Sequence, residues 1–244
     1  MESIVITARS KDDSFDRYLG ASLNNINTKC INVADKPDTD KVKSIATKYN
    51  IGVSIAKNND LLHKDTIVVF AKPCTHIIDN LAMDKISMIF DEKPNVGVIG
   101  VMGAKTLHSG KSLYEASNSP VNGIVYTMNE DDDKGEHVQY SKNGFYDNVV
   151  AVDDSVFAVR GSLLLDNDMT LESESDSGYG IEMSIKSNLN GYSVVVADIL
   201  VLTEDRTTPS SDIIGGIVSN MNLHYPITSV SLGKNINSVV DIDI

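Results

Sequence analysis

The chain has 244 residues, 41% of them hydrophobic, and its 34 acidic residues against 21 basic ones give a formal net charge of −13. This composition is typical of a globular protein, and the negative charge disfavours direct binding to the phosphate backbone of nucleic acid. No apolar run is long enough to span a membrane, and two cysteines are too few for a disulfide framework, so we expect a cytoplasmic protein.

The first hundred residues alternate short apolar runs with helical patterns, which indicates βαβ units around a mainly parallel sheet. Helical periodicity follows Ser14, a residue suited to N-capping, and a second helix capped by Asp38 or Asp40 runs through Tyr49. A third, amphipathic helix is expected over 77–92. We expect strands at 3–7, 30–34, 53–56, 66–70 and 95–104.

The second half of the chain has a different pattern, with alternating apolar and polar residues that favour antiparallel or mixed strands. Such strands are expected at 123–128, 137–141 and 149–160, and the acidic run at 129–136 is expected to form a solvated loop. A helix from about Gly180 to Leu189 ends at Asn190-Gly191, and a single strand follows over 192–202. From Thr207 onward we expect an irregular wrap that ends in a candidate strand, "SVVDIDI".

Polar side chains follow three of the expected strands at their carboxyl ends, which is where open α/β sheets bind ligands. Arg9 follows the first strand, Asp35 the second, and Lys72 and Cys74 the fourth. Asp35 can hold a ribose or a base edge, and Arg9 can face a phosphate or a base, although each could also be a surface charge in a loop. Together they predict a nucleotide crevice without a glycine-rich phosphate loop.

Five segments resemble, in order, the glycosyltransferase-like branch of the GT-A nucleotide-sugar transferases, which are relatives of glycosyltransferase family 2. The resemblance covers about residues 1–205. It implies a GT-A-like α/β fold, with a mixed, mainly parallel sheet and helices on both faces. The segments are "SIATKYN", "DTIVVF", "NVGVIGVMGAKTL", "VVAVDDSVFAVRGSLL" and "GYGIEMSIKSNLNGYSVVVADILVL".

The resemblance also implies how the chain is divided and which residues meet the donor. Residues 1–105 would form the nucleotide-binding half, 106–205 the acceptor and sugar half, and 206–244 a C-terminal extension. Residues 152–160 would form the strand that supports the sugar and the acceptor. The residues expected to contact the nucleotide are Ala8, Arg9, Asp35 and Asn50.

The sequence departs from the family at its chemical positions. Cys74 stands where the family has an acidic residue that holds a divalent ion on the donor diphosphate, and Thr203 stands where a second metal ligand, often histidine, is expected. Gly180 stands at the position of the catalytic base, which is usually an aspartate. A hard cation needs oxygen ligands, and a thiol is a poor replacement. We therefore expect no metal site and no cofactor, with the nucleotide-sugar as a substrate.

Two hypotheses follow from these departures. In the first, the protein is a glycosyltransferase that moves a sugar to an unidentified hydroxyl, and Lys72 or Arg206 supplies the positive charge that the metal would provide. Glu182, Asp153 or Asp154 would then deprotonate the acceptor, unless a retaining mechanism needs no base. Each residue also has an ordinary alternative: Lys72 could point to solvent, and Glu182 could serve the helix dipole.

In the second hypothesis the fold is kept and catalysis is lost. The protein would then be an inactive GT-A-derived component of a larger assembly, and the Asn-, Asp-, Ser- and Lys-rich composition suggests a viral one. It would self-associate or hold a partner through the tail from Thr207 to Ile244. Neither hypothesis involves a membrane span or direct binding to nucleic acid.

Overall fold

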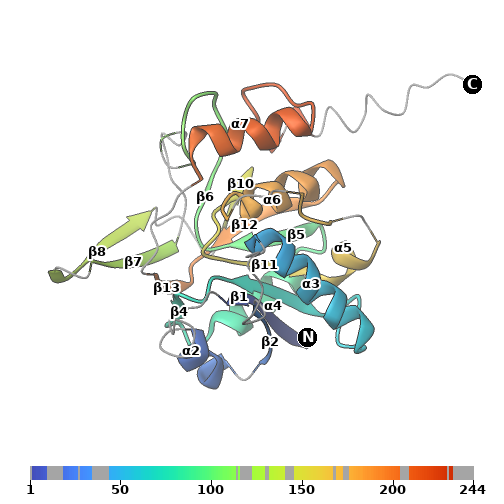
Figure 1. Cartoon of the computed structure of the whole chain (residues 1–244), viewed down its shortest axis with the longest axis vertical. Helices are drawn as coiled ribbons and strands as arrows, with labels where there is room; N and C mark the ends of the chain where they lie inside the picture. Colours follow the sequence, from blue (N-terminus) through green and yellow to red (C-terminus); the bar gives the residue numbers. More distant parts are fainter. Residues whose placement is uncertain are drawn as a thin grey trace, which may run out of the picture.

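The computed structural model describes residues 2–9, 19–26, 28–34, 44–113, 115, 123–129, 132–140, 146–166, 169–172, 176–203, 209–229 and 231–232. Within these residues a seven-stranded sheet lies at the centre, in the order β2-β1-β3-β11-β5-β12-β9 (Figure 1). Its strands are β1 (Ser3–Arg9), β2 (Lys29–Ala34), β3 (Ile67–Ala71), β5 (Val96–Gly100), β9 (Tyr146–Val149), β11 (Val156–Arg160) and β12 (Ser193–Ala197).

The central sheet is mixed. β1 pairs in parallel with β2 and β3, and β12 pairs in parallel with β5. β11 lies between β3 and β5 and is antiparallel to both, with Val156 opposite Ala71. The residues just before β11 therefore lie at the carboxyl end of β3, which is the end where ligands bind in such sheets.

Helices cover both faces of this sheet, as the sequence predicts (Figure 1). On one face lie α2 (Leu19–Ile26) and α4 (Ala82–Glu92), and on the other lie α3 (Ile45–Asn58), α5 (Gly161–Asp166) and α6 (Tyr179–Leu189). Each strand contributes side chains to both layers, because successive side chains point to opposite faces of the sheet. Ile4 and Ile6 pack toward α3, whereas Val5 packs with α2 and α4. No described helix has the length and apolar character that crossing a membrane requires.

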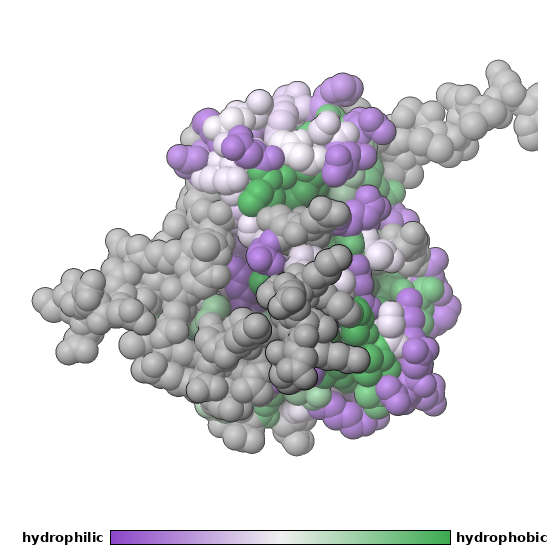
Figure 2. Space-filling view, viewed as in Figure 1, coloured by the Kyte–Doolittle hydropathy of each residue, from purple (hydrophilic) through white to green (hydrophobic). Residues whose placement is uncertain are grey.

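Two smaller sheets and one helix complete the described residues. A four-stranded sheet has the order β4-β13-β7-β8, and a two-stranded sheet joins β10 to β6. α7 (Ser211–Asn220) packs through a third apolar cluster against α6 and the segment after β6, and its edge toward the rest of the molecule is hydrophobic (Figure 2). The bounds are β4 (Thr75–Ile77), β6 (Gly103–Ala104), β7 (Gly123–Asn129), β8 (Asp132–Tyr140), β10 (Ala151–Val152) and β13 (Leu200–Thr203).

The predicted third strand, 53–56, is wrong, because these residues form the second half of α3. Gly52 does not interrupt the helix; it allows close packing on β1, since a Cβ there would lie 2.3 Å from Ile6 Cγ2. The helix begins one turn before Tyr49, and its cap is Ser44, whose hydroxyl accepts the Thr47 N–H at 3.2 Å. The predicted caps Ser14, Asp38 and Asp40 lie outside the described residues.

Other differences arise where the chain moves between sheets. The single strand predicted over 192–202 is two strands, because the chain leaves the central sheet after Ala197 and joins the small sheet as β13. The helix predicted over 77–92 begins only at Ala82, since Ile77 ends β4 and residues 78–81 form the connection between the strand and the helix. The acidic loop is shorter than predicted, because β8 begins at Asp132. The irregular tail contains a regular helix, α7, while "SVVDIDI" lies outside the described residues. The domain boundaries near 105 and 205 stay predictions.

Candidate functional site

Two segments meet at the carboxyl end of β3, and we call them together the β3 edge: residues 71–75 and 153–155. The Lys72 N–H donates to the Ser155 carbonyl oxygen at 3.1 Å, and the Thr75 N–H donates back to the Lys72 carbonyl at 3.1 Å. The Lys72 side chain is 3% exposed, so it is not the solvent-facing lysine that was one alternative. The fold thus brings Lys72 and the Asp153-Asp154 pair together from about 80 residues apart in sequence.

The two positions where the family resemblance implies metal ligands lie side by side. β4 and β13 pair in antiparallel register, with Thr75 opposite Thr203. This register places Cys74 Sγ 4.0 Å from Thr203 Oγ1. A thiol does not fit a hard divalent cation, which prefers oxygen ligands, and the Thr203 hydroxyl supplies one neutral oxygen in place of a charged ligand. Among the described residues, no group of three or more His, Cys, Asp or Glu is arranged to hold a metal ion.

Asp154 fixes the start of α6. Its carboxylate accepts the Gly178 N–H at 2.5 Å and the Gly180 N–H at 2.7 Å, and the Tyr179 hydroxyl donates to its backbone oxygen at 3.1 Å. The first N–H groups of a helix have no intrahelical partner, and a carboxylate there also interacts favourably with the helix dipole. Gly178 has φ 92°, which favours glycine. Both oxygens of the Asp154 carboxylate are therefore engaged in positioning α6.

Asp153 has a different environment from its neighbour. It is 6% exposed, and the Ser155 hydroxyl donates to its Oδ1 at 3.0 Å. Burial raises the pKa of Asp153 to about 7; the Ser155 hydrogen bond and the positive charge of Lys72 oppose this rise, while the negative charge of Asp154 adds to it. A carboxyl group with such a pKa can change its protonation state near neutral pH.

The segment before β11 runs very close to α6. The Val152 N–H donates to the Ser184 hydroxyl at 3.1 Å, and that hydroxyl donates to the Gly180 carbonyl at 2.7 Å. A Cβ at Gly180 would lie 2.3 Å from the Asp153 carbonyl oxygen and 3.0 Å from that of Val152. Gly180 is thus required by close backbone packing, and the family's aspartate does not fit at this position.

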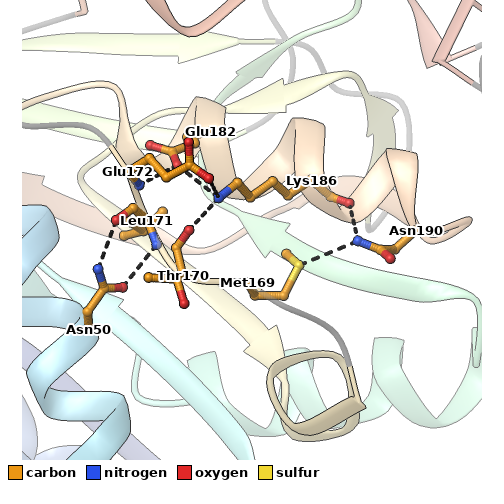
Figure 3. Close-up of polar contacts among 8 residues, drawn as sticks. All are labelled: Asn50, Met169, Thr170, Leu171, Glu172, Glu182, Lys186 and Asn190. Atoms are coloured by element: carbon orange, nitrogen blue, oxygen red, sulfur yellow. Dashed lines mark hydrogen bonds and ion pairs between the residues drawn. The ribbon is translucent and has the colours of Figure 1, made fainter. Parts of the chain in front are cut away.

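Glu182 lies in an ion network that holds residues 169–172, which we call the strap (Figure 3). The Glu182 carboxylate accepts the Glu172 N–H at 2.6 Å and lies 3.2 Å from Lys186 Nζ. Lys186 also donates to the Thr170 carbonyl and pairs with the Glu172 carboxylate at 3.3 Å. Glu182 is 2% exposed, and these contacts explain it as a residue that ties α6 to the strap.

Asn50 holds the same strap from α3 (Figure 3). Its Nδ2 donates to the Leu171 carbonyl at 2.8 Å, and its Oδ1 accepts the Leu171 N–H at 3.0 Å, so both ends of the amide are engaged by one backbone. A cavity of about 140 Å³ lies beneath, between α3, Phe70 and the strap. The nucleotide contact that the family resemblance implies for Asn50 stays a prediction.

Two of the other predicted nucleotide residues, Ala8 and Arg9, lie at the carboxyl end of β1. Ala8 is buried in β1 opposite Val33, and Arg9 ends β1 opposite Ala34. Asp35 and Arg206 lie outside the described residues. The nucleotide contacts of Ala8, Arg9 and Asp35 therefore also stay predictions.

The sequence reasoning missed an aromatic cluster under the β3 edge. Tyr49 and Tyr179 pack edge to face, with ring centroids 5.0 Å apart, and Phe70 stacks on Phe157 at 5.1 Å. Tyr49 also meets Phe70 at 5.1 Å, which joins the two pairs. The four rings come from α3, β3, β11 and α6, so no local pattern in the sequence could have grouped them.

Comparison with known proteins identifies the family. The model of a family described as "Glycosyltransferase like family" matches residues 4–206. The chain belongs to this family. The match confirms the resemblance seen in the sequence, and it spans the central sheet with both of its helical layers. A search of curated proteins finds no match.

Solved structures that share the fold include proteins in complex with UDP or UDP-GlcNAc. Residues 1–349 of S. aureus TarS in complex with UDP-GlcNAc share 12% identity with this chain at a TM-score of 0.56, covering 97% of this family member and 72% of that chain. The structure of GalNAc-T7 with UDP, GalNAc and Mn²⁺ has 11% sequence identity to this chain and a TM-score of 0.54. The match covers 89% of this chain and 47% of that one. A longer TarS structure has 11% sequence identity to this chain and a TM-score of 0.57. That match covers 98% of this chain and 42% of the TarS chain. The family member thus spans about half of GalNAc-T7 and less than half of the longer TarS, and the predicted GT-A-like fold is confirmed.

Proposed function

We propose that this family member transfers a sugar from a nucleotide-sugar donor to a hydroxyl acceptor, and that Lys72 replaces the divalent metal. The observation that carries the proposal is the placement of Lys72. It is buried at the carboxyl end of β3, two residues from the Cys74–Thr203 pair that stands at the family's metal positions.

The chemistry requires a positive charge near the bond that breaks between the sugar and the diphosphate of the donor. As the bond between the sugar and the diphosphate lengthens, negative charge accumulates on the departing phosphate oxygens. A preorganised cation in a site of low dielectric constant stabilises that charge, and a lysine ammonium supplies it as a compact point charge. The positive charge of Lys72 opposes the rise that burial causes in the pKa of Asp153, which supports a site where this charge acts on neighbouring anions.

Ligand-induced stabilisation tests the proposal. Thermal unfolding is measured with UDP-GlcNAc, UDP-GalNAc and GDP-, dTDP- and CMP-sugars, each with manganese or with EDTA. A donor at a hundred times its dissociation constant stabilises the native state by about 2.7 kcal/mol. We expect one nucleotide to raise the melting temperature equally with manganese and with EDTA. Stabilisation only with manganese would show that the chain does hold a metal.

The role of Lys72 is tested by turnover. In Lys72→Ala, release of nucleotide from the donor is expected to fall by at least about 100-fold, which is typical for loss of one group that stabilises the transition state. The matched control is Lys64→Ala, because Lys64 pairs with Asp166 at 3.3 Å on the surface and is 70% exposed. Equal turnover in the Lys72 and Lys64 variants would remove Lys72 from the mechanism.

An inactive binding protein is the second candidate, and one observation favours it. All three chemical positions of the family are changed, and at Gly180 the backbone itself excludes an aspartate. This candidate predicts no stabilisation by any nucleotide-sugar. Its proposed contact through the tail is tested by deleting residues 233–244, since α7 and Ile227 belong to the packed body and deletion from Thr207 would expose a core. An unchanged oligomeric state after this deletion would count against self-association through the tail.

A further inference from the structure

The carboxylates near the start of α6 have distinct surroundings, which separates their roles. Both oxygens of Asp154 accept backbone N–H groups of α6, and the Glu182 carboxylate is engaged by Lys186 and the strap. Asp153 is hydrogen-bonded within its own connection rather than to α6: the Ser155 hydroxyl donates to its Oδ1, and a backbone hydrogen bond from Ser155 also favours its ionised form. It also lies at the β3 edge, beside the lysine that the proposed function places on the donor phosphate.

We infer that the general base has moved from α6 to the connection between β10 and β11, where Asp153 carries it. This inference rests on the proposed function. The backbone of Val152 and Asp153 occupies the space that an aspartate at position 180 would need, since the nearest backbone oxygen would be 2.3 Å from its Cβ. The backbone that excludes the usual base therefore includes Asp153 itself, which lies beside the start of α6 and at the β3 edge.

The proposed step balances as follows. The Asp153 carboxylate accepts the proton of the acceptor hydroxyl, and the acceptor oxygen forms a bond to the anomeric carbon of the sugar. The bond from that carbon to the phosphate oxygen breaks, and its electron pair leaves with the nucleoside diphosphate beside Lys72. In the absence of an acceptor, water takes the place of the hydroxyl, and the products are the free sugar and the nucleotide.

Charged and titratable groups surround Asp153 on several elements. Asp154 and the Ser155 hydroxyl lie on its own connection, Lys72 lies after β3, and Tyr179 lies on α6. The Lys72 charge and the Ser155 hydrogen bond favour the ionised carboxylate, while burial and Asp154 oppose it. This balance permits a base that is ionised only above the acidic range.

The first test uses hydrolysis of the donor that stabilises the protein, with water as the acceptor. Asp153→Asn keeps the shape of the side chain and removes its ability to take a proton. Hydrolysis is expected to fall by at least about 100-fold, the lower range for general base catalysis, while the donor still raises the melting temperature. The matched control is Asp84→Asn, an exposed carboxylate in the first turn of α4, which is expected to hydrolyse the donor at the normal rate.

A second variant gives a readout that a purely structural role would not change. Ser155→Ala removes the side-chain hydrogen bond that favours the ionised form of Asp153 and leaves the backbone hydrogen bond from residue 155 in place. The acidic limb of the pH–rate profile is then expected to move to higher pH, with the rate above that limb retained. An unmoved limb in Ser155→Ala, or normal hydrolysis in Asp153→Asn, would overturn the assignment while leaving sugar transfer intact. Absence of hydrolysis in the unaltered chain would overturn the proposed function and this inference together.

Discussion

Replacement of Asp153 by asparagine is expected to stabilise the folded protein above neutral pH. The reason is that Asp153 is held in a buried environment that opposes its ionised form. Its pKa in the folded chain is raised, so between the two pKa values the folded state binds more protons than the unfolded state. The free energy of unfolding of the unaltered protein therefore falls as the pH rises through that range. Asparagine does not ionise and escapes this loss.

The magnitude follows from the pKa. The ordinary value is 3.8 and the value in the folded chain is about 7, a difference of about three pH units. Each unit corresponds to about 1.4 kcal/mol. The free energy of unfolding of Asp153→Asn, minus that of the unaltered protein, is therefore expected to increase by roughly 4 kcal/mol as the pH rises from about 4 to about 7. Above about pH 7 this difference is expected to stay constant.

Urea unfolding of both proteins at half-unit steps from pH 4 to pH 8.5 measures this difference directly. Other carboxylates also titrate in this range, but they are common to the two proteins and cancel in the comparison. A difference in unfolding free energy that stays constant with pH would refute the argument that Asp153 is an anion disfavoured by burial. The same variant is expected to lose hydrolysis, so it would gain stability and lose activity at one position.

Three further predictions concern packing, and urea unfolding measures each. Gly180→Ala is expected to destabilise the protein by about 1 to 3 kcal/mol, because its Cβ would meet a backbone oxygen at 2.3 Å; a neutral effect would contradict the close packing. Gly215→Ala and Gly216→Ala are each expected to stabilise α7 by about 0.5 to 1 kcal/mol, because nothing lies within 4 Å of the added methyl group, and a loss of stability would show an unseen neighbour. Asn50→Ala is expected to destabilise by about 1 to 3 kcal/mol, because it leaves a part-buried N–H and carbonyl of the strap without their partner; a neutral result would mean that the strap is held by α6 alone.

The sequence predicts the fold well where the hydrophobic pattern of a segment is typical of one kind of secondary structure. β3 is a continuous apolar run with every residue buried, and α6 begins and ends within a residue of its predicted limits. Prediction fails where tertiary contacts override a local signal. Gly52 suggests a break in α3, but it serves the approach of the helix to β1. Asp198 is the one polar residue in the apolar run "VVVADILVL" and is a weak turn signal by itself, yet the chain changes sheets there.

The candidate site could be predicted only in part, for a similar reason. The residue types at the ends of β1 and β3 indicate a ligand edge, and the motif order indicates the family. The sequence cannot show that Asp154 caps α6 or that Glu182 holds the strap, because these partners are 10 to 26 residues away. Nor can it show that Gly180 is imposed by a neighbouring backbone, since that depends on how closely the segment before β11 runs to α6.

The most direct test of metal-independent sugar transfer is nucleotide release from the panel of nucleotide-sugars in EDTA, with the unaltered protein and Lys72→Ala side by side. The account predicts release from one donor in EDTA and a fall of at least about 100-fold in the variant. Release that requires manganese, or release that is equal in the two proteins, would contradict it.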